Sequence, residues 1–243
     1  DPATRELLEQ VDIFVIPTVN PDGANYSFHD FNFQRKNLVN HCTGTSRDPR
    51  NRDAWGVDLN RNYTVGSYFD GYVGGSGNCL SGTYAGSGEL SEAESRNVIA
   101  LAREHRNIRF AMNVHSYGGY FMWPPGAYKA DGRVPLPRPS IDESKLFLDS
   151  ARRIVGAIAQ ERGTVTWPSQ TGPVADVLYS AAGNSADELY YELGIFAWDF
   201  EVGNDRWNDE TGQWEGVGFQ PPFEEAHAES QEYAGGLVGM VRG

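Results

Sequence analysis

The alternation of hydrophobic and polar positions predicts strands and helices in turn along this chain. Apolar residues at every second position, followed by a histidine and Ser-Tyr-Gly-Gly, predict a buried strand over Asn107–Gly119. Continuous apolar runs predict two further strands, Asp12–Pro17 and Ile195–Glu201, that are buried on both faces. Because such strands alternate with helical segments, the pattern favours an α/β protein with helices packed on a mixed sheet.

Helix start signals support this alternation. The S-x-x-E capping pattern precedes three segments and predicts helices that begin near Ser91, Ser140 and Ser185. Glycines predict that the second helix ends at Gly163 and the third at Gly194.

Both ends of the chain also have helical patterns, over Asp1–Glu9 and Pro222–Val241. Between them, the Asn-Pro-Asp-Gly sequence over Asn20–Gly23 predicts a turn. The segment Tyr26–Tyr84 is expected to be mostly loop, and so long an irregular segment in a compact domain is usually functional. No repeat or linker divides the chain, so a single domain is expected.

Composition limits the partners of this protein. Twenty Lys and Arg residues against 33 Asp and Glu residues give a net charge of −13, which disfavours nucleic acid and anionic membranes as partners. No apolar run is long enough to span a bilayer, and the chain opens with a polar segment rather than a signal peptide. We therefore expect a soluble protein that binds neither nucleic acid nor membrane.

The two cysteines, Cys42 and Cys79, both lie in loop sequence rich in Gly, Ser and Asn. This arrangement predicts one disulfide in a secreted, extracellular protein, with two unpaired thiols as the alternative. Closing a loop of this length contributes about 3–4 kcal/mol in the chain-entropy model.

Two predicted strands end in residues that carry chemistry. His115 follows the first, at the carboxyl end where α/β proteins place catalytic side chains, although a lone histidine there can also be a hydrogen-bonded core residue. Glu201 ends the second strand. Since burying a carboxylate is costly, Glu201 is a candidate general base.

Polar residues in the loops add candidates for substrate binding. Asn60 and Arg61 are adjacent, and a guanidinium beside an amide is suited to hold a carboxylate. Arg35 offers a second cation and Tyr179 precedes a loop of small residues. Taken singly, each of these residues has an equally simple structural explanation.

Five segments together resemble the zinc carboxypeptidases of the carboxypeptidase A/B type. They occur in the order of that family: Ile16–Gly23, Arg35–Asn37, Gly56–Tyr63, Asn113–Gly119 and Phe200–Gly203. The resemblance implies a three-layer α/β/α fold with a mixed, twisted sheet and one peptidase domain over residues 1–243. It also implies release of single C-terminal residues from peptides by a zinc-dependent hydrolase.

The resemblance implies a role for each candidate near the metal. His115 would be the third ligand of one zinc ion, Glu201 the general base, and Arg35 the group that polarises the scissile carbonyl. Zinc with three protein ligands lowers the pKa of its bound water to about 7, and a glutamate beside it takes the proton and passes it to the leaving amine.

The same resemblance implies the substrate contacts. Asn60 and Arg61 would bind the terminal carboxylate, Tyr117 would line the site for residues on the amino side of the scissile bond, and Tyr179 would close over the substrate.

One departure from the family concerns the metal. The first two zinc ligands of the family come from a His-x-x-Glu motif, which this chain lacks. We expect that motif, and early strands of the sheet, on an upstream segment that is missing from this chain or cleaved onto another one. The alternative is that the protein has lost the metal and kept its carboxylate pocket. We expect this polypeptide alone not to hydrolyse peptides.

Two residues bear on side-chain preference. Ala186 falls at the position whose acidic occupant marks family members that select Lys or Arg, so a small neutral residue there favours apolar or aromatic C-terminal residues. Asp199 shares a strand face with Glu201 and would attract a basic side chain. Met122, Val174 and Leu178 are expected to form an apolar wall. A mixed apolar and basic preference results.

Two other functions remain open from the sequence. One is a non-catalytic module that binds peptide C-termini, and the other is a cell-wall peptide amidase of the same superfamily.

Overall fold

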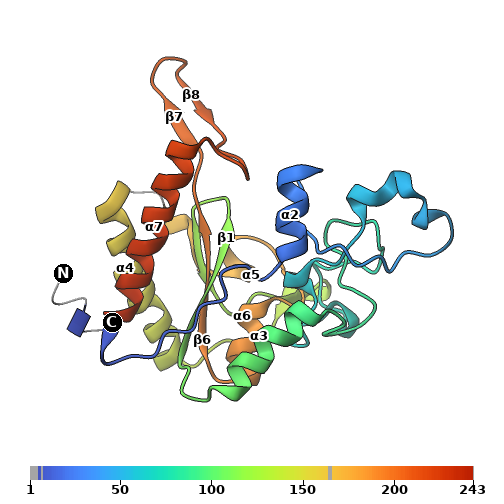
Figure 1. Ribbon diagram of the computed structural model, residues 1–243. Coiled ribbons are helices and arrows are strands. Elements are labelled where there is room, and N and C mark those ends of the chain that lie inside the picture. The colour runs from blue at the N-terminus through green and yellow to red at the C-terminus, as the bar shows by residue number, and fades with distance from the viewer. Residues whose placement is uncertain (1–4, 7, 164–165, 243) are drawn as a thin grey trace.

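The computed structural model describes residues 5–6, 8–163 and 166–242, in which a mixed sheet lies between two layers of helices (Figure 1). The four strands occur in the spatial order β1 (Phe110–Ser116), β6 (Phe196–Val202), β2 (Tyr120–Trp123) and β5 (Thr171–Pro173). β1 runs parallel to β6, β6 antiparallel to β2, and β2 parallel to β5. This confirms the predicted α/β class, with the mixed sheet and the helices on both of its faces.

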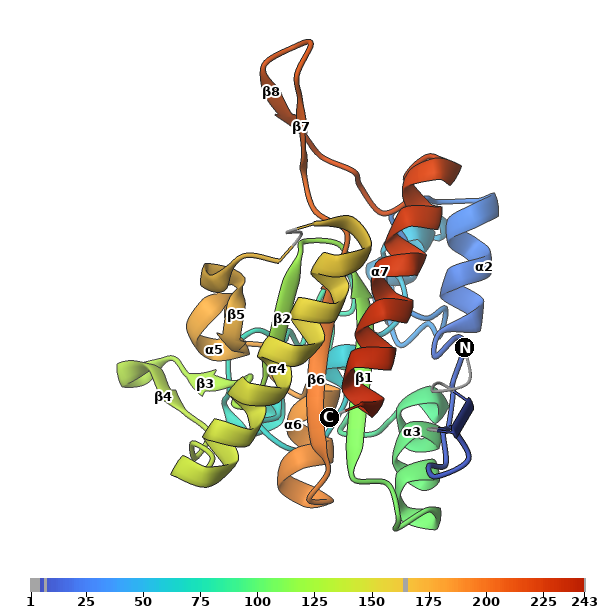
Figure 2. The same cartoon turned by 90° about the vertical axis from the view of Figure 1, so that its left-hand side faces the viewer.

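The long helices α4 (Ile141–Arg162) and α7 (Phe223–Val241) pack together on one face of the sheet (Figure 2). The core beneath them consists of large apolar side chains: Phe121, Trp123, Phe147, Ile154, Ile158, Trp198 and Phe200. Full burial of each such side chain contributes about 1.5–3 kcal/mol, so this face carries much of the stability of the fold.

The opposite face is covered by shorter elements. Helix α3 (Ala93–Glu104) and helix α6 (Ser185–Asp187), which continues into a π-turn over Glu188–Glu192, pack there around Ile99 and Ala197. Two further short helices are α2 (Pro21–His29) and α5 (Val174–Val177), and two hairpins are formed by β3 and β4 (Tyr128–Lys129 and Val134–Pro135) and by β7 and β8 (Arg206–Asn208 and Gln213–Glu215). The remaining elements are 3₁₀ turns: Gly44–Arg47, Pro49–Ala54, Leu59–Arg61, Tyr68–Asp70, Asp131–Arg133 and Pro168–Gln170.

One of the three predicted capping boxes is present. Ser140 accepts a hydrogen bond from the Glu143 amide, and the Glu143 side chain accepts one from the Ser140 amide, so α4 begins as predicted and ends at Gly163. A helix does begin at Ser185 as predicted, but the capping residue predicted there is wrong, because the side chain of Asn184 caps that short helix. The Ser91 hydroxyl instead donates to Glu92, and α3 begins at Ala93.

The turn predicted at Asn20–Gly23 is also wrong, because this segment starts a helix. The Asn20 side chain accepts a hydrogen bond from the Gly23 amide at 3.0 Å, and Pro21 occupies the first position of helix α2. Asparagine at the N-cap followed by proline starts a helix as readily as a turn, because proline has no N–H and the first helical position needs none.

The prediction of a doubly buried strand over Asp12–Pro17 is wrong. This segment has no strand assignment, and Ile13 and Val15 are 53% and 66% exposed. β1 pairs on one side only among the described residues, so Phe110 and Val114 are 48% and 40% exposed rather than buried. Apolar composition predicted burial, but burial also requires a neighbouring element. The helix predicted over residues 1–9 falls largely outside the described residues.

Two further predictions concern the cysteines and membrane-spanning segments. Cys42 and Cys79 form the predicted disulfide, with their Cα atoms 5.4 Å apart. Among the described helices, none combines the length and apolar character needed to cross a membrane.

Candidate active site

The register of β1 and β6 brings the two principal candidates together. The strands are parallel, and His115 is the register partner of Glu201 at their carboxyl ends. One pocket at this position is lined by residues from distant segments of the chain: Arg35, Asn60, Arg61, His115, Met122, Val174, Leu178, Tyr179, Ala181, Asn184, Asp199 and Glu201. Seven of the nine predicted site residues therefore line one pocket, and the predicted apolar wall is part of it.

Arg35 is held in the pocket by a buried carboxylate. Its Nε donates to Asp58 at 2.8 Å, and Asp58 also accepts from the Asn60 amide at 3.1 Å. Burial is the largest influence on Asp58 and raises its pKa, but Arg35, Arg61 and the Asn60 amide together hold the pKa of that carboxyl below its usual value. This pairing fixes Arg35 while keeping it cationic, as a group that stabilises developing negative charge requires.

Asn60 and Arg61 are fixed by contacts that leave donors for a ligand. The Asn60 side-chain oxygen accepts from the Ser185 amide and hydroxyl, so its NH₂ group is the part that remains to donate. Arg61 donates from Nε to the Gly74 carbonyl and from Nη1 to the Asn60 carbonyl, and neither bond uses Nη2. Two oriented donors of this kind match the two oxygens of a carboxylate.

Glu201 has the ionisation expected of a general base. Burial, followed by repulsion from Asp199, raises the pKa of Glu201 to about 7, although Arg35 and Arg61 lower it. A carboxylate whose pKa lies near neutral pH both accepts and returns a proton efficiently.

His115 is partly buried beside Asp199, with 3.8 Å between Nε2 and the nearest carboxylate oxygen. Burial and the nearby Arg35 lower the pKa of His115 to about 4, so the imidazole is neutral at physiological pH, which is the form that binds metal ions. The described residues contain no group of three or more His, Cys, Asp or Glu side chains that forms a metal site. A complete zinc site therefore does not fit the described part of the chain.

Two predicted site residues lie outside the pocket lining. Ala186 is 1% exposed and packs in the core with Ile99 and Leu189. Tyr117 follows β1 directly, and its ring meets that of Phe219 edge to face at a centroid distance of 5.3 Å. The predicted roles of both residues stay predictions. Tyr179 lines the pocket with half of its surface exposed.

Sequence reasoning missed Asp58, Ala181 and Asn184. Asp58 had a local signal, since an Asp two residues before Asn60 is typical of a side chain that caps a short turn. Asn184 had no such signal for the pocket, because its place there depends on the packing of the loop after Tyr179.

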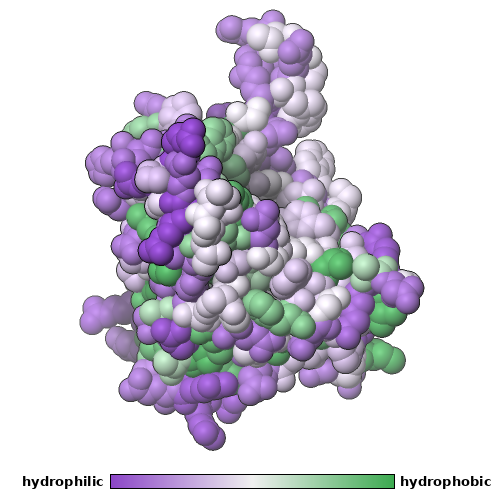
Figure 3. Space-filling view, turned by 90° about the vertical axis from the view of Figure 1, so that its right-hand side faces the viewer, coloured by the Kyte–Doolittle hydropathy of each residue, from purple (hydrophilic) through white to green (hydrophobic). Residues whose placement is uncertain are grey.

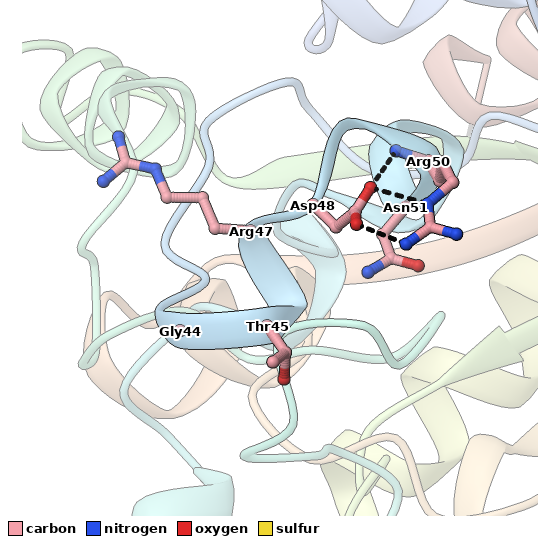
Figure 4. Close-up of a pocket in the computed structure, with 6 residues that line it drawn as sticks. All are labelled: Gly44, Thr45, Arg47, Asp48, Arg50 and Asn51. Atoms are coloured by element: carbon pink, nitrogen blue, oxygen red, sulfur yellow. Dashed lines mark hydrogen bonds and ion pairs between the residues drawn. The ribbon is translucent and has the colours of Figure 1, made fainter.

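A second hollow shares none of these lining residues (Figure 4). It is lined by Gly44, Thr45, Arg47, Asp48, Arg50 and Asn51. Asp48 is occupied by Arg50, which donates to it from the side chain at 2.7 and 3.0 Å and from the backbone. This self-contained arrangement offers no catalytic group.

The chain belongs to the zinc carboxypeptidase family, whose model matches residues 1–234. It is 33% identical to mouse (Mus musculus) carboxypeptidase A4 over 83% of this chain and 43% of that protein. It is 30% identical to bovine (Bos taurus) carboxypeptidase O over 82% of this chain and 47% of that protein. The chain thus spans less than half the length of these relatives.

Solved structures agree on the fold. Bovine thrombin-activatable fibrinolysis inhibitor, solved in complex with tick carboxypeptidase inhibitor, is similar with a TM-score of 0.75 and 25% identity, over 97% of this chain and 70% of that one. The carboxypeptidase A of Helicoverpa armigera has a TM-score of 0.70 and 23% identity, over 92% of this chain and 49% of that one, and shows likeness of fold alone.

Proposed function

We propose that this chain is part of the single peptidase domain of a zinc-dependent metallocarboxypeptidase, which releases one residue at a time from peptide C-termini. The observation that carries this proposal is the shared pocket of Asn60, Arg61, Arg35 and Glu201. A carboxylate clamp beside a general base and an oxyanion donor has the parts that an exopeptidase needs.

Each of these residues has a defined task in the proposed reaction. Asn60 and Arg61 hold the terminal carboxylate, which positions the last peptide bond. Arg35 donates to the carbonyl oxygen as negative charge develops on it. Glu201 accepts a proton from the attacking water and returns it to the leaving amine, which its pKa of about 7 permits.

His115 is proposed as one ligand of the zinc ion. Its partly buried, neutral imidazole supports this role. The other ligands must come from outside the described residues, in which no three-ligand group occurs. We therefore expect the 243-residue chain with added zinc to be inactive, and an upstream segment or second chain to complete the site.

Side-chain preference and location are part of the same proposal. Met122, Val174 and Leu178 favour an apolar C-terminal residue, and buried Asp199 favours a basic one. The Cys42–Cys79 disulfide supports secretion, because disulfides persist in oxidising compartments.

Binding of peptides to the 243-residue chain tests the carboxylate clamp. A peptide ending in free Phe should bind at least about 10-fold more tightly than its C-terminal amide, since a lost charged hydrogen bond costs about 1.5–3 kcal/mol. Arg61→Met should abolish this difference, whereas Arg50→Met on the surface should keep it. Calorimetry measures both.

Hydrolysis by the complete, zinc-loaded protein tests the enzyme. Mass spectrometry should show stepwise loss of single C-terminal residues. Tight carboxylate binding without any such loss would instead identify a module that binds peptide C-termini.

A further inference from the structure

The β7–β8 hairpin is a feature that the proposed function leaves unexplained. It follows β6 after Val202 and so leaves the sheet at the end where His115 and Glu201 lie. Figures 1 and 2 show it standing clear of the helices and the sheet, and Figure 3 shows it projecting beyond the body of the molecule. A short ribbon with so little support is costly to keep unless it contacts something else.

Two exposed tryptophans form a pair on this hairpin. Trp207 and Trp214 are register partners, and their rings meet at a centroid distance of 5.7 Å and an interplanar angle of 69°. They are 51% and 60% exposed. Paired large aromatic side chains in this setting are typical of a contact surface.

The direction of this pair follows from the strand alternation. Arg206 precedes Trp207 and donates to Glu225 of α7 at 2.6 Å, so its face of the ribbon is turned toward α7. Successive side chains of a strand lie on opposite faces, and Trp207 therefore points away from α7.

Three aromatic rings lie between the base of the hairpin and the segments that carry Arg35 and His115. A Cβ on Gly216, the residue after β8, would lie 3.3 Å from the Tyr117 hydroxyl. The Phe219 ring contacts Tyr117 and lies 6.4 Å from that of Phe33, two residues before Arg35. We call Phe33, Tyr117 and Phe219 the aromatic strip; its Tyr117 end lies at the base of the hairpin, two residues after His115 of the pocket.

The charge of the hairpin indicates the chemistry of its ligand. The segment from Asp205 to Glu215 contains four carboxylates and one arginine, Arg206, which already forms an ion pair with Glu225. Asp209 and Glu210 are exposed at its tip. Aromatic faces beside carboxylates bind cations, by the attraction of the ring and by charge.

We propose that the β7–β8 hairpin is an exosite for Lys or Arg side chains of the substrate, several residues before its C-terminus. The inference rests on the proposed function, since a peptide whose carboxylate lies at Asn60 and Arg61 extends past Tyr117 along the aromatic strip. The enzyme would thus select peptides with a basic segment ahead of the residue that it removes.

Calorimetry on the 243-residue chain tests the exosite with two peptides of about ten residues. Both end in the same three residues with free C-terminal Phe, and the amino-terminal half carries three Lys in one and three Glu in the other. The Lys peptide should bind about 10-fold more tightly at low salt.

Variants of the hairpin test which residues are responsible. Trp207→Ser/Trp214→Ser should weaken binding of the Lys peptide about 5- to 10-fold and leave the affinity for the shared tripeptide unchanged. Asp209→Asn/Glu210→Gln should weaken the Lys peptide too, with Asp142→Asn on α4 as the matched control.

Equal binding of the Lys and Glu peptides would overturn the exosite, as would an equal loss for the tripeptide in the tryptophan variant. A third result would also overturn the exosite: the chain sediments with phosphatidylcholine vesicles, the tryptophan variant does not, and neither peptide is preferred. That result would assign the tryptophan pair to a membrane surface. The tripeptide and its amide report separately on the carboxylate clamp. If the amide binds equally well while Lys is still preferred through the tryptophans, the hairpin binds cationic side chains but the carboxylate clamp, and with it the proposed function, fails.

Discussion

The Asn113 side chain of β1 donates a hydrogen bond to the Asp199 carboxylate of β6 at 3.1 Å. The two residues are register partners, and each lies two residues before His115 or Glu201 on the same face of its strand. Asp199 is 5% exposed, and burial raises its pKa to about 6, so it is mostly ionised at neutral pH. An anionic side chain in the pocket wall, oriented by a neighbouring strand, is suited to select the substrate side chain.

Asp199→Thr should lower kcat/KM for peptides ending in Arg by at least about 10-fold, because a buried pairing with a charged group contributes about 1.5–3 kcal/mol. Activity on peptides that end in Phe should change little. Initial rates of the complete zinc-loaded protein on both peptides measure this, and equal losses on the two would rule out the assigned role.

The preference for Arg over Phe should also depend on pH. Asp199 gains a proton as the pH falls through about 6, and its attraction for a cation is then lost. The ratio of kcat/KM for the two peptides should therefore fall between about pH 7 and pH 5 in the unaltered protein. In Asp199→Thr the ratio should stay flat over the same range.

Glu201→Gln should lower kcat by about 10²–10⁴-fold, the usual contribution of a general acid–base group. KM should change by less than about 3-fold, because the amide keeps the size of the side chain and the carboxylate clamp is intact. The control is Glu104→Gln at the exposed end of α3, beyond the opposite end of β1. A kcat for Glu201→Gln equal to that of the control would exclude the general-base role.

A buried acidic cluster on α7 predicts a dependence of stability on pH. Glu225, Glu229 and Glu232 are at most 7% exposed, and Arg162 and Arg206 supply two cations for three carboxylates. Burial raises the pKa of Glu229 and Glu232 above the unfolded value of 4.5. The folded state therefore binds more protons than the unfolded state above that pH, so this contribution to stability is present below about pH 4.5 and is lost as the pH rises.

Glu229→Gln should remove part of that loss. Urea denaturation should show the variant gaining stability relative to the unaltered chain between about pH 5 and pH 8. Glu104→Gln should show no such trend. If the free energy of unfolding of Glu229→Gln differs from that of the unaltered chain by the same amount at both pH values, the assignment is contradicted.

Removing the disulfide should destabilise the loop region that carries the binding residues. Cys42 and Cys79 are 37 residues apart, and in the chain-entropy model the double Cys→Ser variant should lose about 3–4 kcal/mol in free energy of unfolding. Urea denaturation measures this, and reduction of the unaltered chain should reproduce the loss. An unchanged midpoint in both would show that the bridge contributes nothing to stability.

Much of the sheet and its helices was predictable because the signals are local. The apolar runs of β1 and β6, the Ser140 capping box and Gly163 each define an element from adjacent residues. The candidate site was predictable for a similar reason, since its residues occur in short segments that resemble those of one family. Seven of the nine site residues line one pocket.

One failure concerns neighbours that are distant in the sequence. Asp12–Pro17 is apolar enough for a core strand, but its side chains are exposed because no described element covers them. Asn20 begins a helix instead of a turn, and Asn184 instead of Ser185 caps α6. For these two helix starts the failure was local, because the same residue pattern suited two structures.

The sequence by itself predicted the class of fold from periodicity, favoured one disulfide from the setting of its two cysteines, and named the candidate residues through short segments that resemble one family. Only the tertiary structure decided which of these residues meet: Asp58 holds Arg35, Ala186 is buried away from the pocket lining, and Trp207 opposes Trp214 on a free hairpin. The physical reason is that pairing, burial and shifted pKa values arise from groups far apart in the chain, whose proximity no local pattern encodes.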